Sequence, residues 1–337
     1  MVLLLAENHV KLRGGREPDG SFFWVKTGGG TDPRFVENAG PRPDLQGGSQ
    51  AQSMTGRKSV NPIIEKQDLS ENVVRMVLAA PDIARKRRAG QFIILKMDEK
   101  GERIPLTIVD SDAVAGTLTI IFQVVGKTTT ALAAMKVGDA LSDVQGPLGN
   151  ATEIENFGHV VCIGGGVGVG VVYPLAAALK KAGNRVTSII GARTKTLLIL
   201  EEEMKKVSDK LIVATDDGSY GFHGFVSAVL QNLIDAKEKI DRVYAIGPVP
   251  MMRVLCNVTK PYGIRTIVSL NPIMVDATGM CGACRVSVGG KTKFTCVDGP
   301  EFDGHEVDFA LLTNRLRMYQ TQEKQSMEAY RCECHGK

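Results

Sequence analysis

The sequence predicts an antiparallel β-barrel, followed by an α/β domain with a parallel sheet and a short cysteine-bearing region at the C-terminus. Three observations lead to this order. Short alternating apolar runs fill about residues 61–148, as half-buried strands of a small barrel do. Strand and helix patterns then alternate over 158–246, which indicates a parallel sheet covered by helices. Beyond Leu270 the alternation stops, and three cysteines fall within sixteen positions.

Residues 1–55 differ from the rest of the chain. They are rich in Gly, Pro, Asp and Arg, and no helical or strand period extends far. We expect a mostly disordered extension outside the catalytic body, or a start codon assigned too early, since Met54 precedes the first regular pattern. The domain boundaries then fall at 56–152 for the barrel, 153–268 for the α/β domain, and 269–337 for the cysteine region and C-terminal tail.

The individual elements follow from local periodicity. In the barrel region, strand patterns occupy 72–78, 91–96 and 117–125, and an apparent helix covers 131–135. In the α/β region, strand patterns at 159–163, 185–190, 211–214 and 242–246 alternate with helical patterns at 171–182, 199–207 and 225–236.

The bulk composition excludes several classes of protein. The chain has 41 basic and 37 acidic side chains, without a basic stripe interleaved with aromatics, so nucleic acid is not an expected partner. No segment approaches the roughly 18 apolar residues of a membrane-spanning helix, and the short apolar start is not a signal peptide. Seven cysteines without a secretion signal argue against a disulfide framework. We therefore expect a cytoplasmic protein.

A glycine-rich loop follows the first strand of the predicted parallel sheet. Its glycines are Gly164, Gly165, Gly166 and Gly168. A loop between a strand and a helix points backbone N–H groups outward and suits a pyrophosphate, although a plain tight turn would also use glycines. The dinucleotide spacing G-x-G-x-x-G fails at Val169, and the second strand is followed by Arg193 and Lys195 instead of ending in an acidic residue.

Two further segments are expected at the same carboxyl edge of the sheet, where open α/β sheets bind ligands. Gly247, Pro248 and Met251 follow the last strand and open a helix, although proline placement alone also explains a helix start. Asp217 lies in the turn after the third strand. It either lines a nicotinamide pocket or only shapes the turn.

The barrel region contains two fragments that can bind a flavin nucleotide. The first consists of Arg103, Pro105, Leu106 and Thr107, and the second of Gly126, Lys127, Thr128 and Thr129. An arginine beside a strand offers a bidentate fork to phosphate, and a threonine hydroxyl can reach a flavin ring. A Gly-Lys-Thr turn at a helix start can hold a diphosphate. Each fragment alone also occurs in ordinary strands and loops.

The strongest motif joins one aspartate to three cysteines: Asp276, Cys281, Cys284 and Cys296. Plant-type [2Fe–2S] sites use C-x4-C-x2-C and a distant fourth cysteine; here the spacing matches, with aspartate in the first position. Glycines at 279 and 282 favour a tight loop. A tetrahedral zinc site that includes His305 or an aspartate, or unliganded cysteines, are the alternatives.

The order of these motifs resembles the ferredoxin–NADP reductase family over about residues 58–265. The resemblance implies FAD on the barrel and a nicotinamide on the α/β domain. The cysteine pattern is similar to two groups of small flavin-containing subunits, that of dihydroorotate dehydrogenase and that of NADH-dependent reduced ferredoxin:NADP oxidoreductase, also described as sulfide dehydrogenase. The second group uses one Asp and three Cys, with the barrel sequence RIPLTI, found here at 103–108, and CVDGPEF, found here at 296–302.

This resemblance implies an electron-transfer enzyme subunit. Hydride would pass between NAD(H) and FAD, and a [2Fe–2S] cluster would carry single electrons to a larger flavin and [4Fe–4S] partner subunit, which contacts ferredoxin. Together they would couple NADH and reduced ferredoxin to NADP reduction by electron bifurcation. No catalytic acid or base is expected, because the cofactors carry the chemistry. Arg193 and Lys195 leave NADP(H) open as the nucleotide.

Two other functions remain open at this point. One is the electron-transfer subunit of a dihydroorotate dehydrogenase, and the other is a non-catalytic interaction module stabilised by zinc. Cys332, Cys334 and His335 at the terminus could ligate a metal, although chain ends fray. Cys162 and Cys256 lie in apolar patterns and are expected to be small core residues.

Overall fold

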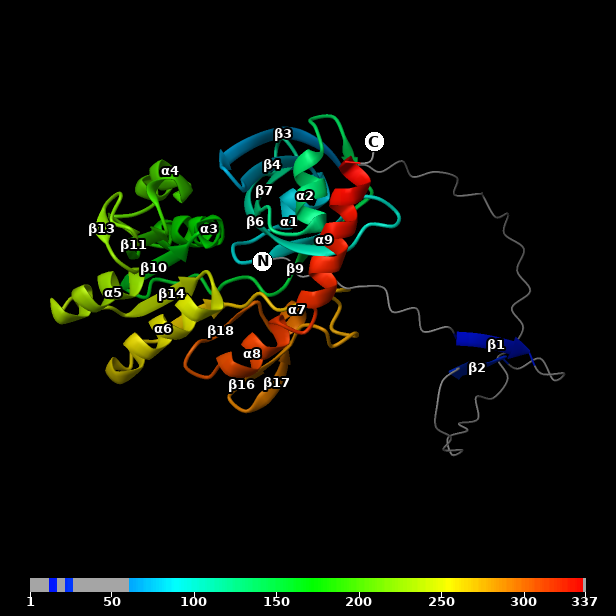
Figure 1. Ribbon diagram of the computed structural model, residues 1–337. Coiled ribbons are helices and arrows are strands. Elements are labelled where there is room, and N and C mark those ends of the chain that lie inside the picture. Colours follow the sequence, from blue (N-terminus) through cyan, green and yellow to red (C-terminus); the bar gives the residue numbers. More distant parts are fainter. Residues whose placement is uncertain (1–11, 17–21, 27–60, 336–337) are drawn as a thin grey trace. The chain divides into compact units, whose positions relative to one another are not determined.

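The computed structural model describes residues 12–16, 22–26 and 61–335 (Figure 1). The chain divides into two units, of which the smaller is Ala6–Arg57. In that unit β1 (Leu12–Arg16) pairs with β2 (Phe22–Lys26) in an antiparallel register. The sequence pattern did not predict these two strands. The other parts of the predicted extension, Met54 included, lie outside the described residues.

The larger unit begins with a seven-stranded antiparallel sheet. Its strands are β3 (Asn61–Ser70), β4 (Val73–Ala79), β5 (Phe92–Lys96), β6 (Ile104–Asp112), β7 (Thr117–Gln123), β8 (Ala140–Leu141) and β9 (Asp143–Leu148). They lie in the order β8-β3-β4-β7-β6-β5-β9. The two edge strands are consecutive in the chain, so the sheet curls into a nearly closed barrel. Two helices accompany it, α1 (Pro81–Lys86) and α2 (Lys127–Ala134).

The barrel strands pack on one side around an interior that contains Met76, Ile108 and Ile120, each fully buried. Strand β7 is buried on both faces, which explains why its apolar run does not alternate strictly. Leu118 and Ile120 point into the barrel, whereas Ile121 packs against the α/β domain. One strand thus joins the two cores.

The second sheet holds the strands β10 (His159–Gly165), β11 (Arg185–Ala192), β12 (Lys210–Thr215), β13 (Phe222–His223), β14 (Arg242–Ile246), β15 (Thr266–Ser269) and β18 (Glu301–Asp303). Their order is β13-β12-β11-β10-β14-β15-β18. All pairs are parallel except β15 with β18. The first strand, β10, lies in the middle of the sheet. Strands β11, β12 and β13 follow on one side of it, and β14 and β15 follow on the other. The neighbouring strands β10 and β14 therefore end side by side at the point where the strand order reverses.

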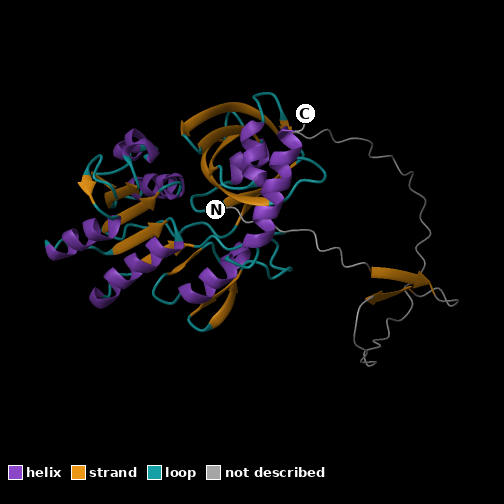
Figure 2. Ribbon diagram, in the orientation of Figure 1, coloured by secondary structure: helices purple, strands orange, loops and turns teal. Residues whose placement is uncertain are grey.

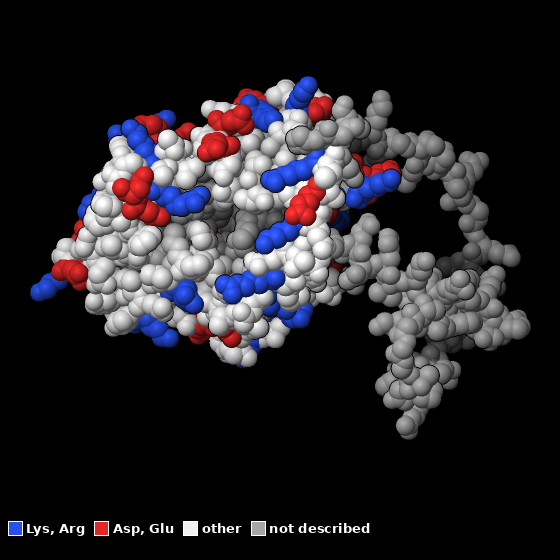
Figure 3. All heavy atoms as spheres, viewed as in Figure 1, with Lys and Arg blue, Asp and Glu red and all other residues white. Residues whose placement is uncertain are grey.

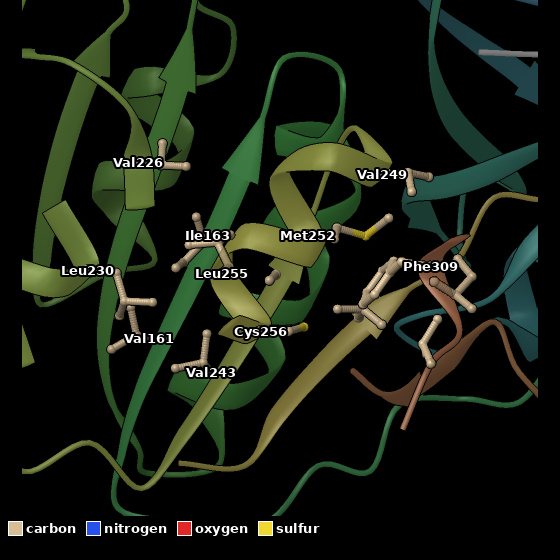
Figure 4. Packing of buried hydrophobic residues seen from close by; sticks show 14 of the residues in the cluster. Val161, Ile163, Val226, Leu230, Val243, Val249, Met252, Leu255, Cys256 and Phe309 are labelled. Atoms are coloured by element: carbon tan, nitrogen blue, oxygen red, sulfur yellow. The ribbon is translucent and has the colours of Figure 1, made fainter. Parts of the chain in front are cut away.

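Helices cover both faces of this sheet (Figure 2). On one face α3 (Gly168–Lys181) and α4 (Glu201–Lys206) pack over Val160 and Cys162. On the other face α5 (Val226–Asp235) and α6 (Val249–Thr259) pack over Val161 and Ile163 (Figure 4). Successive side chains of β10 therefore point into the cores on opposite faces of the sheet, because side chains alternate along a strand.

After β15 the chain forms a small region beside the sheet. It contains the hairpin of β16 (Arg285–Val288) and β17 (Lys291–Phe294), then α7 (Thr295–Asp298), β18 and the helices α8 (Phe309–Leu316) and α9 (Gln320–His335). The sequence analysis did not predict α8 or α9. Among the described residues, no helix combines the length and apolar character that crossing a membrane requires.

The predicted fold class is confirmed: an antiparallel barrel precedes a parallel α/β sheet and a cysteine-bearing region. Helix α3 begins three residues before the predicted 171–182, because Gly168 and Gly170 belong to the helix. Helix α2 likewise begins at Lys127 rather than at 131. The boundaries at 56–152, 153–268 and 269–337 stay a prediction.

Shortening Leu230 tests the packing of α5 on the sheet. The side chain is fully buried among Val161, Val226 and Val243 (Figure 4). Leu230→Ala should lower the free energy of unfolding by about 2–5 kcal/mol, because it leaves a cavity in a close-packed core. Denaturant unfolding followed by circular dichroism measures this. Val114→Ala, at a fully exposed position, is the control; equal stability of both variants would contradict the assigned packing.

Candidate functional site

A cavity of about 570 Å³ lies where the barrel, the parallel sheet and the C-terminal region meet. The expected flavin strand contributes Pro105, Leu106 and Thr107 to its wall. The glycine loop contributes 165–168, and the segment that opens α6 contributes 246–250. Residues 269–274 and the junction of α8 and α9 complete the wall. One cavity thus brings together segments that the sequence assigned to two different cofactors.

The glycines of the loop permit a close backbone approach between the ends of β10 and β14. A Cβ at Gly165 would lie 2.4 Å from Sδ of Met251, and a Cβ at Gly168 would lie 2.5 Å from the carbonyl oxygen of Ile246. Gly164 is buried beneath the turn, where a Cβ would meet Val169. The glycines at these positions are therefore required by contacts within the protein.

Gly166 differs from its neighbours. Its φ is +55°, and a Cβ there would meet no atom within 4 Å. The residue lines the cavity, so its backbone faces open space in which a ligand can lie. Asn271 lines the same cavity, and its buried Oδ1 has no hydrogen-bond partner among the described residues. An acceptor without a donor in an apolar wall fits a bound group with N–H or O–H donors, such as the flavin ring or the nicotinamide amide.

The expected diphosphate residues of the barrel lie beside this cavity, and their polar atoms contact protein groups. Arg103 donates to Oε1 of Gln145 at 2.5 Å. Oγ1 of Thr129 accepts the backbone N–H groups of Val125 and Gly126 at 3.0 and 3.1 Å, which fixes the turn at the start of α2.

Thr128 and Lys127 stand next to an acidic side chain that the sequence analysis did not consider. The hydroxyl of Thr128 donates to the carboxylate of Glu102. Burial raises the pKa of Glu102, and the hydrogen bond from Thr128 and the charge of Lys127 offset part of that rise. The negative charge of Glu102 would repel a phosphate bound at this turn unless the positive charges of Lys127 and Arg103 compensate it.

A second cavity, of about 500 Å³, adjoins the first across Gly165 and Gly166. Arg193 and Asp216 line it, together with Pro248 and Met251. Asp216 lies in the turn after the third strand, β12, where the sequence had indicated its neighbour Asp217.

The other polar residues of this edge are held by neighbours. Asp217 accepts hydrogen bonds from the backbone N–H and hydroxyl of Ser219, at 2.9 and 2.7 Å, and it lines neither cavity. Nζ of Lys195 lies 4.9 Å from the ring centroid of Tyr220. The cation and the carboxylate that face the second cavity are therefore Arg193 and Asp216.

The four predicted cluster ligands form two pairs. Sγ of Cys284 lies 3.2 Å from Sγ of Cys296, and both side chains are buried. Hydrogen bonds from the backbone N–H of Thr278 and from Cys281 lower the pKa of Asp276, which pairs these two residues. Burial and the neighbouring Cys284 raise the pKa of Cys296 to about 12.

This paired arrangement bears on the kind of metal site. Among the described residues, no group of three or more His, Cys, Asp and Glu side chains is placed to hold one metal ion. His305, the alternative zinc ligand, has its Nε2 2.8 Å from Oγ1 of Thr259. A [2Fe–2S] cluster takes two protein ligands on each iron, and two pairs of ligands fit that requirement better than a single tetrahedral ion.

The loop that carries the ligands bends sharply at three residues. Gly279 and Gly282 have φ values of +82° and +66°, in agreement with their expected role. Ala277, directly after Asp276, has a φ of +60°, a conformation that costs about 1–2 kcal/mol for a residue with a Cβ. The chain turns back at once after the aspartate, which brings Asp276 toward Cys281.

The cysteine pair and the large cavity share two side chains. Phe92 and Met274 line the cavity, and both belong to the buried cluster that contains Cys284 and Cys296. No sequence motif indicated Phe92 or Met274. Only the packing of β5 against the ligand loop joins them.

A polar contact ties the cysteine region to the connection between the two sheets. The carboxylate of Glu301 accepts a hydrogen bond from Thr152 at 2.7 Å. Burial raises the pKa of Glu301 to about 7, although the hydrogen bond lowers it. The side chain is thus a buried titratable group that the sequence analysis missed.

The remaining cysteines lie away from these sites. Cys162 and Cys256 are buried in the sheet cores, and burial raises the pKa of each to about 12. Cys332 is exposed on α9. The side chains of Cys334 and His335 lie outside the described residues, so the alternative of a terminal metal site stays a prediction.

Comparison with known proteins identifies two domains. The family model of the oxidoreductase FAD-binding domain matches residues 61–152. The model of the iron-sulfur cluster binding domain of dihydroorotate dehydrogenase B matches residues 271–308.

Whole-chain relatives agree with these domains. A Thermotoga maritima protein, the dihydroorotate dehydrogenase B (NAD(+)) electron transfer subunit homolog, is 48% identical over 82% of this chain and 97% of its own length. The corresponding electron transfer subunit of Bacillus caldolyticus is 35% identical over 75% of this chain and 99% of its own. A chain of the solved NADH-dependent reduced ferredoxin-NADP oxidoreductase structure is 47% identical, with a TM-score of 0.77, over 82% of this chain and 99% of that one.

The matches cover 97–99% of the relatives' own lengths. The chain therefore belongs to the family of the dihydroorotate dehydrogenase B electron transfer subunits and their homologues, electron-transfer subunits with an FAD-binding domain and an iron–sulfur domain on a ferredoxin–NADP reductase-like fold.

Proposed function

We propose that this chain passes electrons between NAD(H), FAD and a [2Fe–2S] cluster to a larger flavin and [4Fe–4S] partner subunit. That complex, in the cytoplasm, would couple the oxidation of NADH and reduced ferredoxin to NADP reduction by flavin-based electron bifurcation, run in either direction. The observation that carries the proposal is the shared wall formed by Phe92 and Met274. These residues line the cavity where the flavin strand meets the nucleotide edge, and they also pack against the cysteine pair. A flavin in this cavity would lie within a few side chains of the cluster.

The residues of the chain bind and orient the cofactors. When bound, FAD accepts two electrons as hydride and releases them singly. Pro105, Leu106 and Thr107 line the cavity and would hold the flavin ring. Arg103 and the turn at Gly126, Lys127, Thr128 and Thr129 would hold the diphosphate. The apolar side chains around them exclude water from the reacting atoms.

The nucleotide would bind across the two cavities. Gly165 and Gly166 line both, and Pro248 does as well, so the pyrophosphate would cross there, beside the start of α3. The nicotinamide would reach the flavin cavity, and the adenosine end would lie in the second cavity.

Asp216 favours NAD(H) over NADP(H). A carboxylate accepts hydrogen bonds from ribose hydroxyls and repels a 2′-phosphate. Arg193 lines the same cavity and can balance part of that charge, whereas Lys195 lies over the Tyr220 ring.

The runner-up is the electron-transfer subunit of a dihydroorotate dehydrogenase. Relatives with that function in their names include the Thermotoga maritima homolog, at 48% identity, and the Bacillus caldolyticus subunit, at 35%. The ferredoxin-NADP oxidoreductase chain is 47% identical, so identity does not separate the two functions. The aspartate at 276, which resembles the ferredoxin-NADP oxidoreductase group, favours the proposal. Reduction of NAD by dihydroorotate in the purified complex, without NADP reduction from NADH and ferredoxin, would favour the runner-up.

The cofactor content is the first test of the proposal. Anaerobically purified protein should contain one FAD, about two iron and about two acid-labile sulfide per chain, with flavin bands in the visible spectrum. Colorimetric iron and sulfide assays, with flavin released by acid, measure this. Zinc without sulfide would support the zinc-stabilised module instead.

Changing Asp276→Cys tests the ligand set. A thiolate donates more charge to iron than a carboxylate, so the variant should keep its cluster with a reduction potential shifted by tens of millivolts, on the order of other ligand effects. Redox titration monitored by electron paramagnetic resonance measures it. Asp68→Cys, at an exposed position of β3, controls for the added thiol. An unshifted potential would rule out Asp276 as a ligand.

Asp216→Asn tests nucleotide choice. Wild-type protein should reduce its flavin faster with NADH than with NADPH, and the variant should lower that ratio about tenfold, because one charge facing the 2′-phosphate is removed. Stopped-flow absorbance records both rates. Asp217→Asn is the matched control, since its side chain lines neither cavity. A wild-type preference for NADPH would overturn the assignment.

A further inference from the structure

The wall of the large cavity contains a single charged side chain. Of the residues that line it, only Arg317 carries a charge. The rest are apolar side chains, glycines, prolines and neutral polar groups such as Thr107 and Asn271. Figure 3 shows a hollow between the barrel and the α/β domain, with Lys and Arg side chains at its rim. No other charged side chain of this wall offsets the cation.

The C-terminal helices fix the backbone of Arg317 at this position. Leu312 and Leu316 of α8 are buried in the core of the sheet. The guanidinium of Arg315 donates to the carbonyl oxygen of Ala283 at 3.0 Å, which ties α8 to the loop of the cluster ligands. Arg317 is the C-cap residue of α8, directly after Leu316, and its backbone N–H donates to the carbonyl oxygen of Asn314.

The side chain of Arg317 is exposed, and no hydrogen bond or ion pair joins its guanidinium to any described residue. Arg103, by contrast, contacts Gln145 and lies 3.9 Å from Asp143. An arginine at a helix C-terminus also stabilises the helix dipole. That role alone would not require the side chain to line a cavity, so the two roles lead to different experimental results.

We propose that Arg317 raises the reduction potential of FAD. Its guanidinium stabilises the negative charge that the flavin acquires on reduction. The inference rests on the FAD site of the proposed function. The redox-active ring is the relevant part of the cofactor, because the cavity contains Thr107 and the nicotinamide edge at 246–250, while the expected diphosphate residues Arg103 and Thr128 do not line it.

The charge balance of hydride transfer gives Arg317 its role. The C–H bond of the reduced nicotinamide breaks, and two electrons and one proton pass to the flavin. The nicotinamide gains one positive charge and the flavin gains one negative charge. A nearby guanidinium binds the reduced flavin more tightly than the neutral oxidised form, and this difference raises the flavin reduction potential.

Replacing the cation tests this difference. In Arg317→Gln, reduced FAD should bind about tenfold more weakly relative to oxidised FAD, which corresponds to a two-electron potential about 30 mV lower. Spectroelectrochemical titration gives the potential, and flavin fluorescence gives the dissociation constant of oxidised FAD. Arg317→Lys should recover part of the shift. Lys324→Gln removes an exposed cation of α9 that does not line the cavity, and should leave the potential unchanged.

Each other outcome overturns the inference. A wild-type potential in Arg317→Gln would do so. A lower melting temperature with an unchanged potential would also do so, since it would leave Arg317 only its effect on the end of α8. An equal shift in Lys324→Gln would reduce the effect to general surface charge. Wild-type protein that binds no FAD would overturn this inference together with the proposed function, whereas the earlier outcomes leave the FAD site intact.

Discussion

The close approach of the glycine loop to the start of α6 is the constraint on which both cavities depend. A side chain at Gly168 would collide with the backbone carbonyl of Ile246, and one at Gly165 would displace the Met251 side chain. Because β10 and β14 end side by side at the reversal of strand order, this contact opens a space above the sheet rather than filling it. The barrel closes that space from the other side through β6 and β7.

The iron–sulfur region is joined to this space by packing rather than by sequence proximity. The segment 269–274 first lines the cavity and then runs into Asp276. Phe92 of the barrel strand β5 packs beside the buried pair Cys284 and Cys296. Apolar contacts at this junction join the wall of the large cavity to the cysteine pair.

Polar groups occur where these regions must keep a fixed orientation. The hydrogen bond from Thr152 to Glu301 ties the connection between the sheets to the strand that follows the last cluster ligand. Arg315 ties α8 to the ligand loop. Each contact joins segments more than thirty residues apart in the chain. The C-terminal helices therefore belong to the architecture of the site, and Arg317 reaches the cavity as a result.

Local pattern determined much of this protein. Period-two runs and the alternation after Gly158 predicted the barrel and the parallel sheet, because strand and helix periods follow from backbone geometry. The spacing of Asp276, Cys281 and Cys284 predicted a ligand loop with a distant fourth ligand, because plant-type clusters take three ligands from one tight loop. Only the tertiary structure decided which carboxylate lines the second cavity, Asp216 or Asp217. It also brought Phe92 and Arg317 to the large cavity, because contacts between distant segments leave no period or motif in the sequence.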